Sequence, residues 1–276
     1  MLGVIAGDII GSPYEGGHAP ARGFPLFPPE ARFTDDTVLA VAVAWAILEG
    51  RDYGEALRLW GRRYPHAGYG SAFLSWLSAE DPRPYGSFGD GSAMRVAPVG
   101  WAGCDLDEVI DEAGRSAAPT HDHPEGIRGA QATAGALFLA RTGHNKAEVR
   151  AFLEQRFGYD LSASLEEVRA RGAIRPICRE AVPAAAICFL DARDFEDAVR
   201  KAVSLGGDTD TVAAIAGALA EAFHGGVPAP IQRESLARLP HPLRETAVRF
   251  ARRFGVPLSL ERAEKGTDRD GTGPRA

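Results

Sequence analysis

Two segments of the chain place acidic and hydroxyl side chains directly ahead of an apolar run. They are residues 34–37, Thr-Asp-Asp-Thr, and residues 208–211, Asp-Thr-Asp-Thr, and in each an Asp-Thr-Val triplet opens the run. Asp and Thr are good N-caps, so one interpretation is that each segment only satisfies the free N–H groups at a helix start. A single capping residue would be enough for that purpose, whereas adjacent carboxylates repel each other.

A divalent cation would offset this repulsion if the fold brought the two segments together. Carboxylate and hydroxyl oxygens are hard ligands that suit Mg²⁺, Mn²⁺ or Ca²⁺ better than zinc. About six such oxygens, completed by bridging waters, can hold two ions. The repetition of the motif therefore favours a metal site over capping alone.

A third acidic segment, GDIIGSPYEGG, lies near the N-terminus and carries Asp8 and Glu15. Its glycines predict a mobile loop, because glycine is the residue with the greatest backbone freedom. A carboxylate on such a loop beside a metal cluster can act as a general base or gate the substrate. The alternative for Glu15 is a solvated loop residue without a role in chemistry.

Two further segments carry groups suited to an anionic ligand. In SFGDGSAMR, Gly89 and Gly91 flank Asp90, and glycines ahead of a helix let backbone N–H groups face a phosphate, although short glycine loops are common. In THDHP, His121 can donate a hydrogen bond to a phosphate or ribose oxygen, or bind a metal together with His123. The alternative is that both histidines only shape the loop before a helix.

The elements that must position these groups are predicted to be helices. Residues 37–50 are rich in Ala and Leu and end at Gly50, which suits a buried helix closed by a C′ glycine. Asp52 can cap the helix that follows. Most later segments repeat the 3.6-residue apolar period, and convincing alternating strands are absent. The remaining helices are expected within residues 53–64, 71–80, 106–117, 124–143, 146–158, 183–192, 195–207 and 211–226.

This pattern predicts an all-α fold, a compact single-domain multi-helix bundle. No Ser- or Gly-rich linker separates two blocks of different composition, so we expect one helical domain over residues 1–260. Residues 261–276 are polar and Gly-rich, and we expect a disordered tail there. The Pro-rich stretch 16–32 is expected to be a surface excursion over whatever it covers.

Composition excludes several classes of protein. The chain has 276 residues, of which 45% are hydrophobic, enough to bury a sizeable core. Its formal net charge of -6 argues against a general nucleic-acid or membrane-surface binder, although local donors can still hold a small anion. The N-terminus has no basic signal region, and no run of about eighteen apolar residues could span a membrane. We therefore expect a cytoplasmic protein with no membrane partner.

Taken together and in this order, the chemical segments resemble the ADP-ribosyl-glycohydrolase family, the relatives of dinitrogenase reductase-activating glycohydrolase. The resemblance covers the chain from about Gly3 to Gly226, and its paired Asp-Thr segments are the most specific feature. It implies a compact all-α bundle with a binuclear magnesium or manganese centre in a cleft. It also implies ADP-ribose, or a substrate modified with ADP-ribose, as the ligand.

The resemblance assigns roles position by position. The acidic residue on the family's substrate-gating loop falls on Glu15, which with Asp35 and Asp210 makes up the implied catalytic set. Many relatives have Gly-Asn-Gly where this chain has Asp90 between two glycines, and a carboxylate beside a diphosphate is unfavourable. We therefore expect the Asp90 side chain not to contact the ligand. The implied metal ligands are Thr34, Asp35, Asp36, Asp208, Asp210 and Thr211. The implied substrate-binding residues are Gly89, Gly91, Ser92, Met94 and His121.

The implied activity is metal-dependent hydrolysis of the glycosidic bond between ADP-ribose and a modified acceptor, which releases ADP-ribose. A protein side chain, a nucleic acid and a small molecule all remain open as the acceptor. One alternative is a non-catalytic ADP-ribose-binding protein of the same fold. A second is a helical metal-dependent phosphohydrolase, suggested by the His121-Asp122 pair, which would need further His and Asp ligands on helices.

Overall fold

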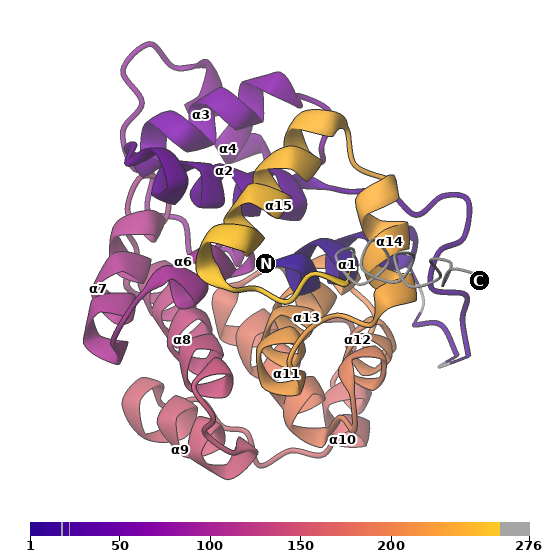
Figure 1. Ribbon diagram of the computed structural model, residues 1–276. Coiled ribbons are helices and arrows are strands. Elements are labelled where there is room, and N and C mark those ends of the chain that lie inside the picture. The colour runs from indigo at the N-terminus through magenta and orange to yellow at the C-terminus, as the bar shows by residue number, and fades with distance from the viewer. Residues whose placement is uncertain (18, 22, 260–276) are drawn as a thin grey trace, which may run out of the picture.

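The computed structural model describes residues 1–17, 19–21 and 23–259, and α-helices dominate this part of the chain (Figure 1). Connections of varied length link them, the longest being residues 15–34, and the short 3-10 helix η1 (Ser12–Tyr14) follows α1. The helices are α1 (Leu2–Gly11), α2 (Asp35–Glu49), α3 (Tyr53–Arg63), α4 (Ser71–Ser78), α5 (Gly91–Met94), α6 (Ala97–Ala102), α7 (Leu106–Ala117), α8 (Pro124–Arg141), α9 (Lys146–Phe157), α10 (Leu165–Ala170), α11 (Cys178–Asp191), α12 (Phe195–Val203), α13 (Thr209–His224), α14 (Ala229–Ala237) and α15 (His241–Phe254).

The all-α prediction is confirmed. In the described part of the chain, extended pairing is limited to two isolated bridges, Gly89 with Ile177 and Ile174 with Gly207. No helix in that part is both long enough and apolar enough to cross a bilayer. The tail predicted for residues 261–276 lies outside the described residues.

The helix ends follow the capping residues of the sequence. The side chain of Thr34 accepts from the backbone N–H of Asp36 at the start of α2, and Gly50 closes the helix at φ 61°, a left-handed conformation that favours glycine. Asp52 caps α3 by accepting from Glu55, as the sequence predicts. Local side-chain chemistry therefore sets both ends of the connection between α2 and α3.

Two segments differ from the prediction. Residues 2–11 form a buried helix, α1, where the glycines led us to expect a mobile loop. Helix α11 begins at Cys178 rather than near Pro183, so the proline lies inside the helix. Pro183 is the sixth residue of α11, so it removes the helical hydrogen bond to the carbonyl of Arg179, and this loss is offset by the buried face of the helix, which packs in the core.

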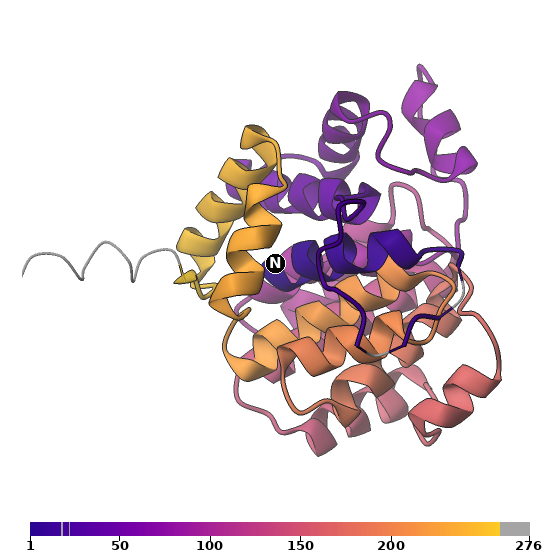
Figure 2. The same ribbon diagram turned by 90° about the vertical axis from the view of Figure 1, so that its right-hand side faces the viewer.

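Helix α1 lies at the middle of the molecule, between two groups of helices (Figures 1 and 2). One group contains α2, α3, α4 and α15, and the other contains α8, α11, α12 and α13. Helix α1 packs along α13, and α13 packs in turn on α8, α11 and α12. The apolar side chains of both groups belong to one continuous buried cluster. The two Asp-Thr segments sit at the first turns of α2 and α13, and both of these helices pack on α1.

Glycine makes the central contact possible. A Cβ atom on Gly7 would lie 2.1 Å from the carbonyl oxygen of Ala213, and one on Gly11 would lie 2.5 Å from the Cα of Asp210. These separations are far shorter than real carbon contacts. The backbones of α1 and α13 therefore touch directly, and this approach brings Asp8 on α1 beside Asp210 on α13.

Candidate metal centre and ligand cleft

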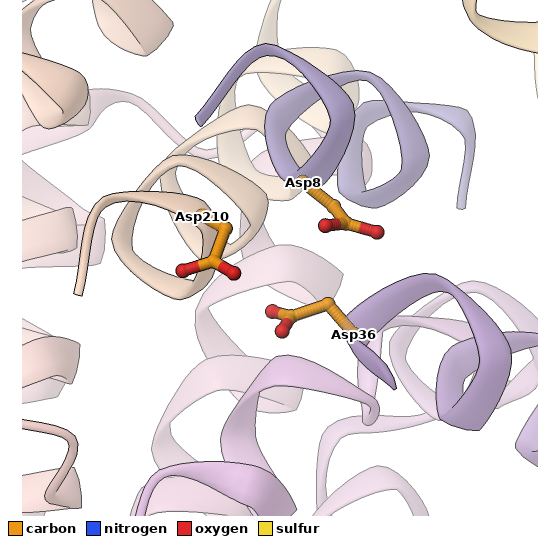
Figure 3. A group of neighbouring side chains, drawn as sticks. All are labelled: Asp8, Asp36 and Asp210. Carbon is orange, nitrogen blue, oxygen red and sulfur yellow. The ribbon is translucent and has the colours of Figure 1, made fainter. Parts of the chain in front are cut away.

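Three carboxylates from three separate helices meet at the centre of the molecule. Asp8 comes from α1, Asp36 from the first turn of α2, and Asp210 from the first turn of α13 (Figure 3). One oxygen of each lies within 4.8 Å of the others, and all three residues are buried. The two Asp-Thr segments, which are more than 170 residues apart, therefore converge as the metal hypothesis requires.

Asp8 fixes the first turn of α2. Its Oδ1 accepts from the hydroxyl of Thr34 at 2.7 Å, and its Oδ2 accepts from the backbone N–H groups of Thr34 and Thr37 at 2.9 and 3.1 Å. The hydroxyl of Thr37 also donates to Oδ2. Because both of its oxygens are taken by α2, Asp8 acts first as the support that aligns the start of this helix.

A second group of oxygens adjoins the first. Glu15, Asp208 and Asp210 also bring their carboxylates within 4.8 Å of one another, so Asp210 belongs to both groups. Glu15 is exposed and follows η1, and the N–H of the next residue, Gly16, donates to the carbonyl of Gly207 at 2.9 Å. This bond ties the loop that carries Glu15 to the start of α13.

Asp90 joins the cluster from the glycine-rich loop. It is 5% exposed, it lines the cleft, and its carboxyl group lies beside that of Asp208. The expectation that the Asp90 side chain does not contact the ligand stays a prediction, because this residue borders the cleft. Burial raises the pKa of Asp90 to about 6.

Burial and mutual repulsion disfavour the ionised carboxylates. Burial raises the pKa of Asp8 to about 6, although its four hydrogen bonds from Thr34 and Thr37 act in the opposite direction. For Asp35, Asp36 and Asp210, burial first and the negative charges of neighbouring carboxylates second raise the pKa well above its ordinary value. Without a cation, the polypeptide therefore does not compensate the negative charge that these carboxyl groups carry when they are ionised.

The donor set fits divalent cations. Asp36 Oδ1, Asp90 Oδ2 and Asp208 Oδ2 are buried oxygens with no hydrogen-bond partner among the described residues. Buried polar atoms are normally satisfied, and a hard cation is the partner that suits several converging carboxylates. The hydroxyl of Thr211 lies 3.3 Å from Asp36 Oδ2, so one more oxygen borders the same space. The predicted ligands Asp36, Asp208 and Thr211 thus contribute oxygens to one site.

The cluster borders a cleft of about 420 Å³. Helix α4 and the segment before it form one wall, through Gly68, Gly70 and Phe73. The glycine-rich loop forms another wall. The cleft lining includes the following predicted site residues: Glu15, Asp35, Asp36, Asp208, Asp210, Thr211, Gly89, Gly91, Met94 and His121.

Two predicted site residues lie behind the cleft wall. The hydroxyl of Ser92 is buried and donates to the carbonyl of Gly126 at 2.7 Å, so it ties α5 to α8. The hydroxyl of Thr34 is engaged with Asp8. Neither side chain lines the cleft in the described structure, and any contact of Ser92 with a ligand would come from its backbone.

The histidines of the THDHP segment have different positions. His121 is 5% exposed and lines the cleft, whereas the ring of His123 caps α8 by accepting from the N–H of Glu125. Asp122 accepts from the N–H of Gly86 at 2.7 Å. The His-Asp pair therefore does not join the carboxylate cluster, and the phosphohydrolase alternative lacks the arrangement of ligands that it needs.

Sequence reasoning gave no structural role to two residues of the site. The sequence analysis considered Asp8 only as a carboxylate on a mobile loop, and its isolation among apolar residues is the signal that could have indicated a buried supporting role. Arg95 is fully buried and lines the cleft, directly after α5. A charged residue inside the apolar run after the glycine-rich loop was the corresponding signal.

Comparison with known proteins agrees with this geometry. The chain is 29% identical to the ADP-ribosylhydrolase ARH3 of Homo sapiens over 70% of this chain and 71% of the relative. It is 26% identical to the ADP-ribosylarginine hydrolase Tri1 of Pseudomonas putida over 82% of this chain and 69% of the relative. A solved structure described as an ADP-ribosylglycohydrolase-related protein complex aligns with a TM-score of 0.69 and 29% identity, covering 91% of this chain and 95% of that one.

The family assignment rests on nearly the whole chain. A sequence model of the ADP-ribosylglycohydrolase family matches residues 1–265, which includes every segment of the carboxylate cluster and of the cleft. The resemblance inferred from the residues is thereby confirmed, and so is the helical fold that it implied. This chain belongs to the ADP-ribosylglycohydrolase family.

Proposed function

We propose that the protein hydrolyses the glycosidic bond between ADP-ribose and a modified acceptor, with two divalent cations, Mg²⁺ or Mn²⁺, bound at the carboxylate cluster. The observation that carries this proposal is the convergence of two oxygen groups that share Asp210 at the edge of a cleft. Membership of the family and the hydrolase names of the relatives support the reaction type.

The residues that would hold the cations are Asp35, Asp36, Asp208, Asp210, Thr34 and Thr211. The unpartnered oxygens of Asp36 and Asp208 are the free acceptors of this set. Bound cations would offset the repulsion among the carboxylates and orient oxygen groups of the ribose and of the attacking water.

The carboxylates themselves would favour the transition state. Positive charge develops on the ribose as its glycosidic bond breaks, and Asp35 and Asp210 supply a negative field beside the cleft. Asp210 is buried and Asp35 is half-buried, so water screens their charges less than it would at the surface. Their contribution is therefore electrostatic and does not require proton transfer.

Glu15 is the residue placed to accept the proton of the attacking water. It is exposed, it lines the cleft, and its carboxylate lies within 4.8 Å of those of Asp208 and Asp210. A carboxylate that remains accessible can exchange its proton with solvent after each turnover. The loop from Gly89 to Met94 and His121, which also line the cleft, would receive the diphosphate.

The test is release of free ADP-ribose from substrates of defined linkage. The panel should contain arginine-, serine- and nucleic-acid-linked ADP-ribose, each incubated with Mg²⁺ or Mn²⁺ and with chelator. We expect metal-dependent release from at least one substrate. Glu15→Gln should lower kcat at least a hundredfold, as expected for a general base, with a much smaller change in the Kd for ADP-ribose.

Glu30→Gln provides the matched control. Glu30 is an exposed glutamate of the same N-terminal connection, and it lies outside the cleft lining. Its replacement should leave kcat unchanged. Binding of ADP-ribose without release from any substrate of the panel would instead support the non-catalytic alternative, and equal losses of kcat and affinity in Glu15→Gln would exclude the role of base.

A further inference from the structure

A buried arginine lies behind the ligand end of the cleft. Arg95 is 0% exposed, and its Nη2 donates to Thr120 Oγ1 at 2.9 Å and to the carbonyl of Ser116 at 3.1 Å. Its Nε and Nη1 have no hydrogen-bond partner in the described part of the chain. Burying a guanidinium so incompletely paired is costly, so the position calls for a function.

Thr120 connects Arg95 to His121. The hydroxyl of Thr120 lies 2.7 Å from His121 Nδ1, and Thr120 is also fully buried. A hydroxyl has one proton and two acceptor positions. Arg95 can only donate, so it occupies one acceptor position, and of the two side chains hydrogen-bonded to this hydroxyl only His121, through Nδ1, can accept. The hydroxyl proton is then directed to Nδ1 of His121.

Burial, together with the same arginine, keeps the imidazole neutral. Burial first and the positive charge of Arg95 second hold the pKa of His121 well below its ordinary value. A neutral imidazole carries one proton. If Nδ1 accepts from Thr120, that proton resides on Nε2. A cationic donor also polarises the Thr120 hydroxyl, which makes it a better donor to Nδ1.

The opposite edge of the ring faces the glycine-rich loop. A Cβ atom on Gly91 would lie 3.1 Å from Nε2, and one on Gly89 would lie 3.7 Å from it. The absence of side chains at these two positions leaves the Nε2 edge open to the loop that lines the cleft.

From this geometry we infer that Arg95 and Thr120 are positioning residues that hold His121 as a neutral Nε2–H donor aimed at a phosphate oxygen of the ligand. The inference rests on the proposed function for the identity of that ligand, ADP-ribose. The hydrogen bonds run in one direction. Arg95 donates to Thr120, Thr120 donates to His121, and His121 donates to the ligand. A donor with a fixed tautomer meets an anion without first rearranging.

The tautomer itself is the first test, and it needs no ligand. In ¹⁵N-labelled protein, long-range ¹H–¹⁵N spectra of the histidine rings should show His121 as the Nε2–H tautomer, with His121→Ala identifying its signals. Thr120→Ser keeps the hydroxyl and should preserve that tautomer. Thr120→Val removes the donor at nearly constant volume and should shift His121 to a mixture that includes Nδ1–H. An unchanged tautomer in Thr120→Val would overturn the inference.

Affinity is the second test. Calorimetry with ADP-ribose should give about tenfold weaker binding for Thr120→Val, the effect of weakening one hydrogen bond to a charged group, and near wild-type binding for Thr120→Ser. In a His121→Ala background, adding Thr120→Val should weaken ADP-ribose binding little further, because Thr120 affects the ligand only through the His121 ring. An equal tenfold loss of affinity in that background would contradict the role of Thr120 as a residue that positions His121. If no variant bound ADP-ribose, the proposed function would fail while the spectra still decided the tautomer.

Discussion

At the scale of single residues, the site is defined by carboxylates whose charges the polypeptide does not balance. Among the described residues, Asp36, Asp90 and Asp208 each leave one buried oxygen without a hydrogen bond, whereas Asp8 has both oxygens engaged. This contrast separates two roles within one cluster. Asp8 supports the first turn of α2, and the residues with free oxygens are the ones available to a cation.

Asp90 offers a direct test of this electrostatic cost. Its pKa of about 6 lies above the ordinary value of 3.8, so the folded protein binds a proton more tightly than the unfolded chain does. The stability that Asp90 contributes is present below pH 3.8 and is lost as pH rises through 6. In metal-free protein, Asp90→Asn should therefore gain stability over wild type as pH rises from 4.5 to 7.5, by up to roughly 2 kcal/mol in urea unfolding.

An exposed aspartate serves as the control for this measurement. The pKa of Asp160 is lowered by hydrogen bonds from Ser162. A lowered pKa contributes stability at neutral pH, so Asp160→Asn should lose stability relative to wild type as pH rises. A pH-independent difference between Asp90→Asn and wild type would show that the carboxylate is not destabilised by its surroundings.

The sequence predicted most of the residues that converge at the carboxylate cluster and little of their support. The two Asp-Thr segments are local patterns, because a capping residue and its helix adjoin each other in the chain. Asp8 could not be assigned in the same way, because its partners are Thr34 and Thr37 on another helix. Arg95 and Thr120 are likewise joined only through the fold, at a separation of 25 residues.

At the scale of elements, the packing of α1 on α13 sets the distance between the two halves of the cluster. Glycines lower helix propensity, so the segment 2–11 predicted a loop when considered alone. In the folded protein the same glycines allow backbone contact with α13, and this tertiary packing stabilises the helix. The helices with ordinary apolar periodicity, such as α7 and α12, were predictable because their pattern is contained in their own sequence.

Gly7→Ala should separate these helices. The added methyl group would lie 2.1 Å from the carbonyl oxygen of Ala213, so α1 must move away from α13 and take Asp8 with it. We expect a loss of about 2 kcal/mol or more in unfolding free energy, as for overpacked cores, together with weaker binding of Mn²⁺. Chemical unfolding and calorimetric titration with Mn²⁺ measure the two effects.

Gly23→Ala is the control for the added methyl group. A Cβ atom at Gly23 meets nothing within 4 Å, so this variant should keep both the stability and the Mn²⁺ affinity of wild type. If Gly7→Ala also kept both, the close approach of α1 and α13 would not be what positions Asp8.

At the scale of the whole molecule, the cluster joins segments that are distant in the chain. Asp8, Asp36, Asp90 and Asp210 come from α1, α2, the loop before α5, and α13. Cations that bind the folded cluster more tightly than the unfolded chain must stabilise the entire fold. At a metal concentration of about 100 times Kd, the gain is about 2.7 kcal/mol for one site, which corresponds to a rise in Tm of roughly 5 °C for a protein of this size.

Because the carboxylates are divided between two oxygen groups, the rise in Tm on metal binding should depend on which carboxylate is replaced. Asp36 belongs to the group with Asp8, Asp208 belongs to the group with Glu15, and Asp210 belongs to both. Titrating chelator-treated protein with Mn²⁺ should therefore give no rise in Tm for Asp210→Asn, and a reduced rise for Asp36→Asn and for Asp208→Asn. Each of these two variants should bind about one ion, and wild type two.

If Asp36→Asn alone abolished binding and Asp208→Asn left it intact, a single cation would occupy the group that contains Asp8 and Asp36. Because Asp210 is the only carboxylate shared by the two groups in the described structure, its variant alone should lose both ions while the helices that carry the site remain folded.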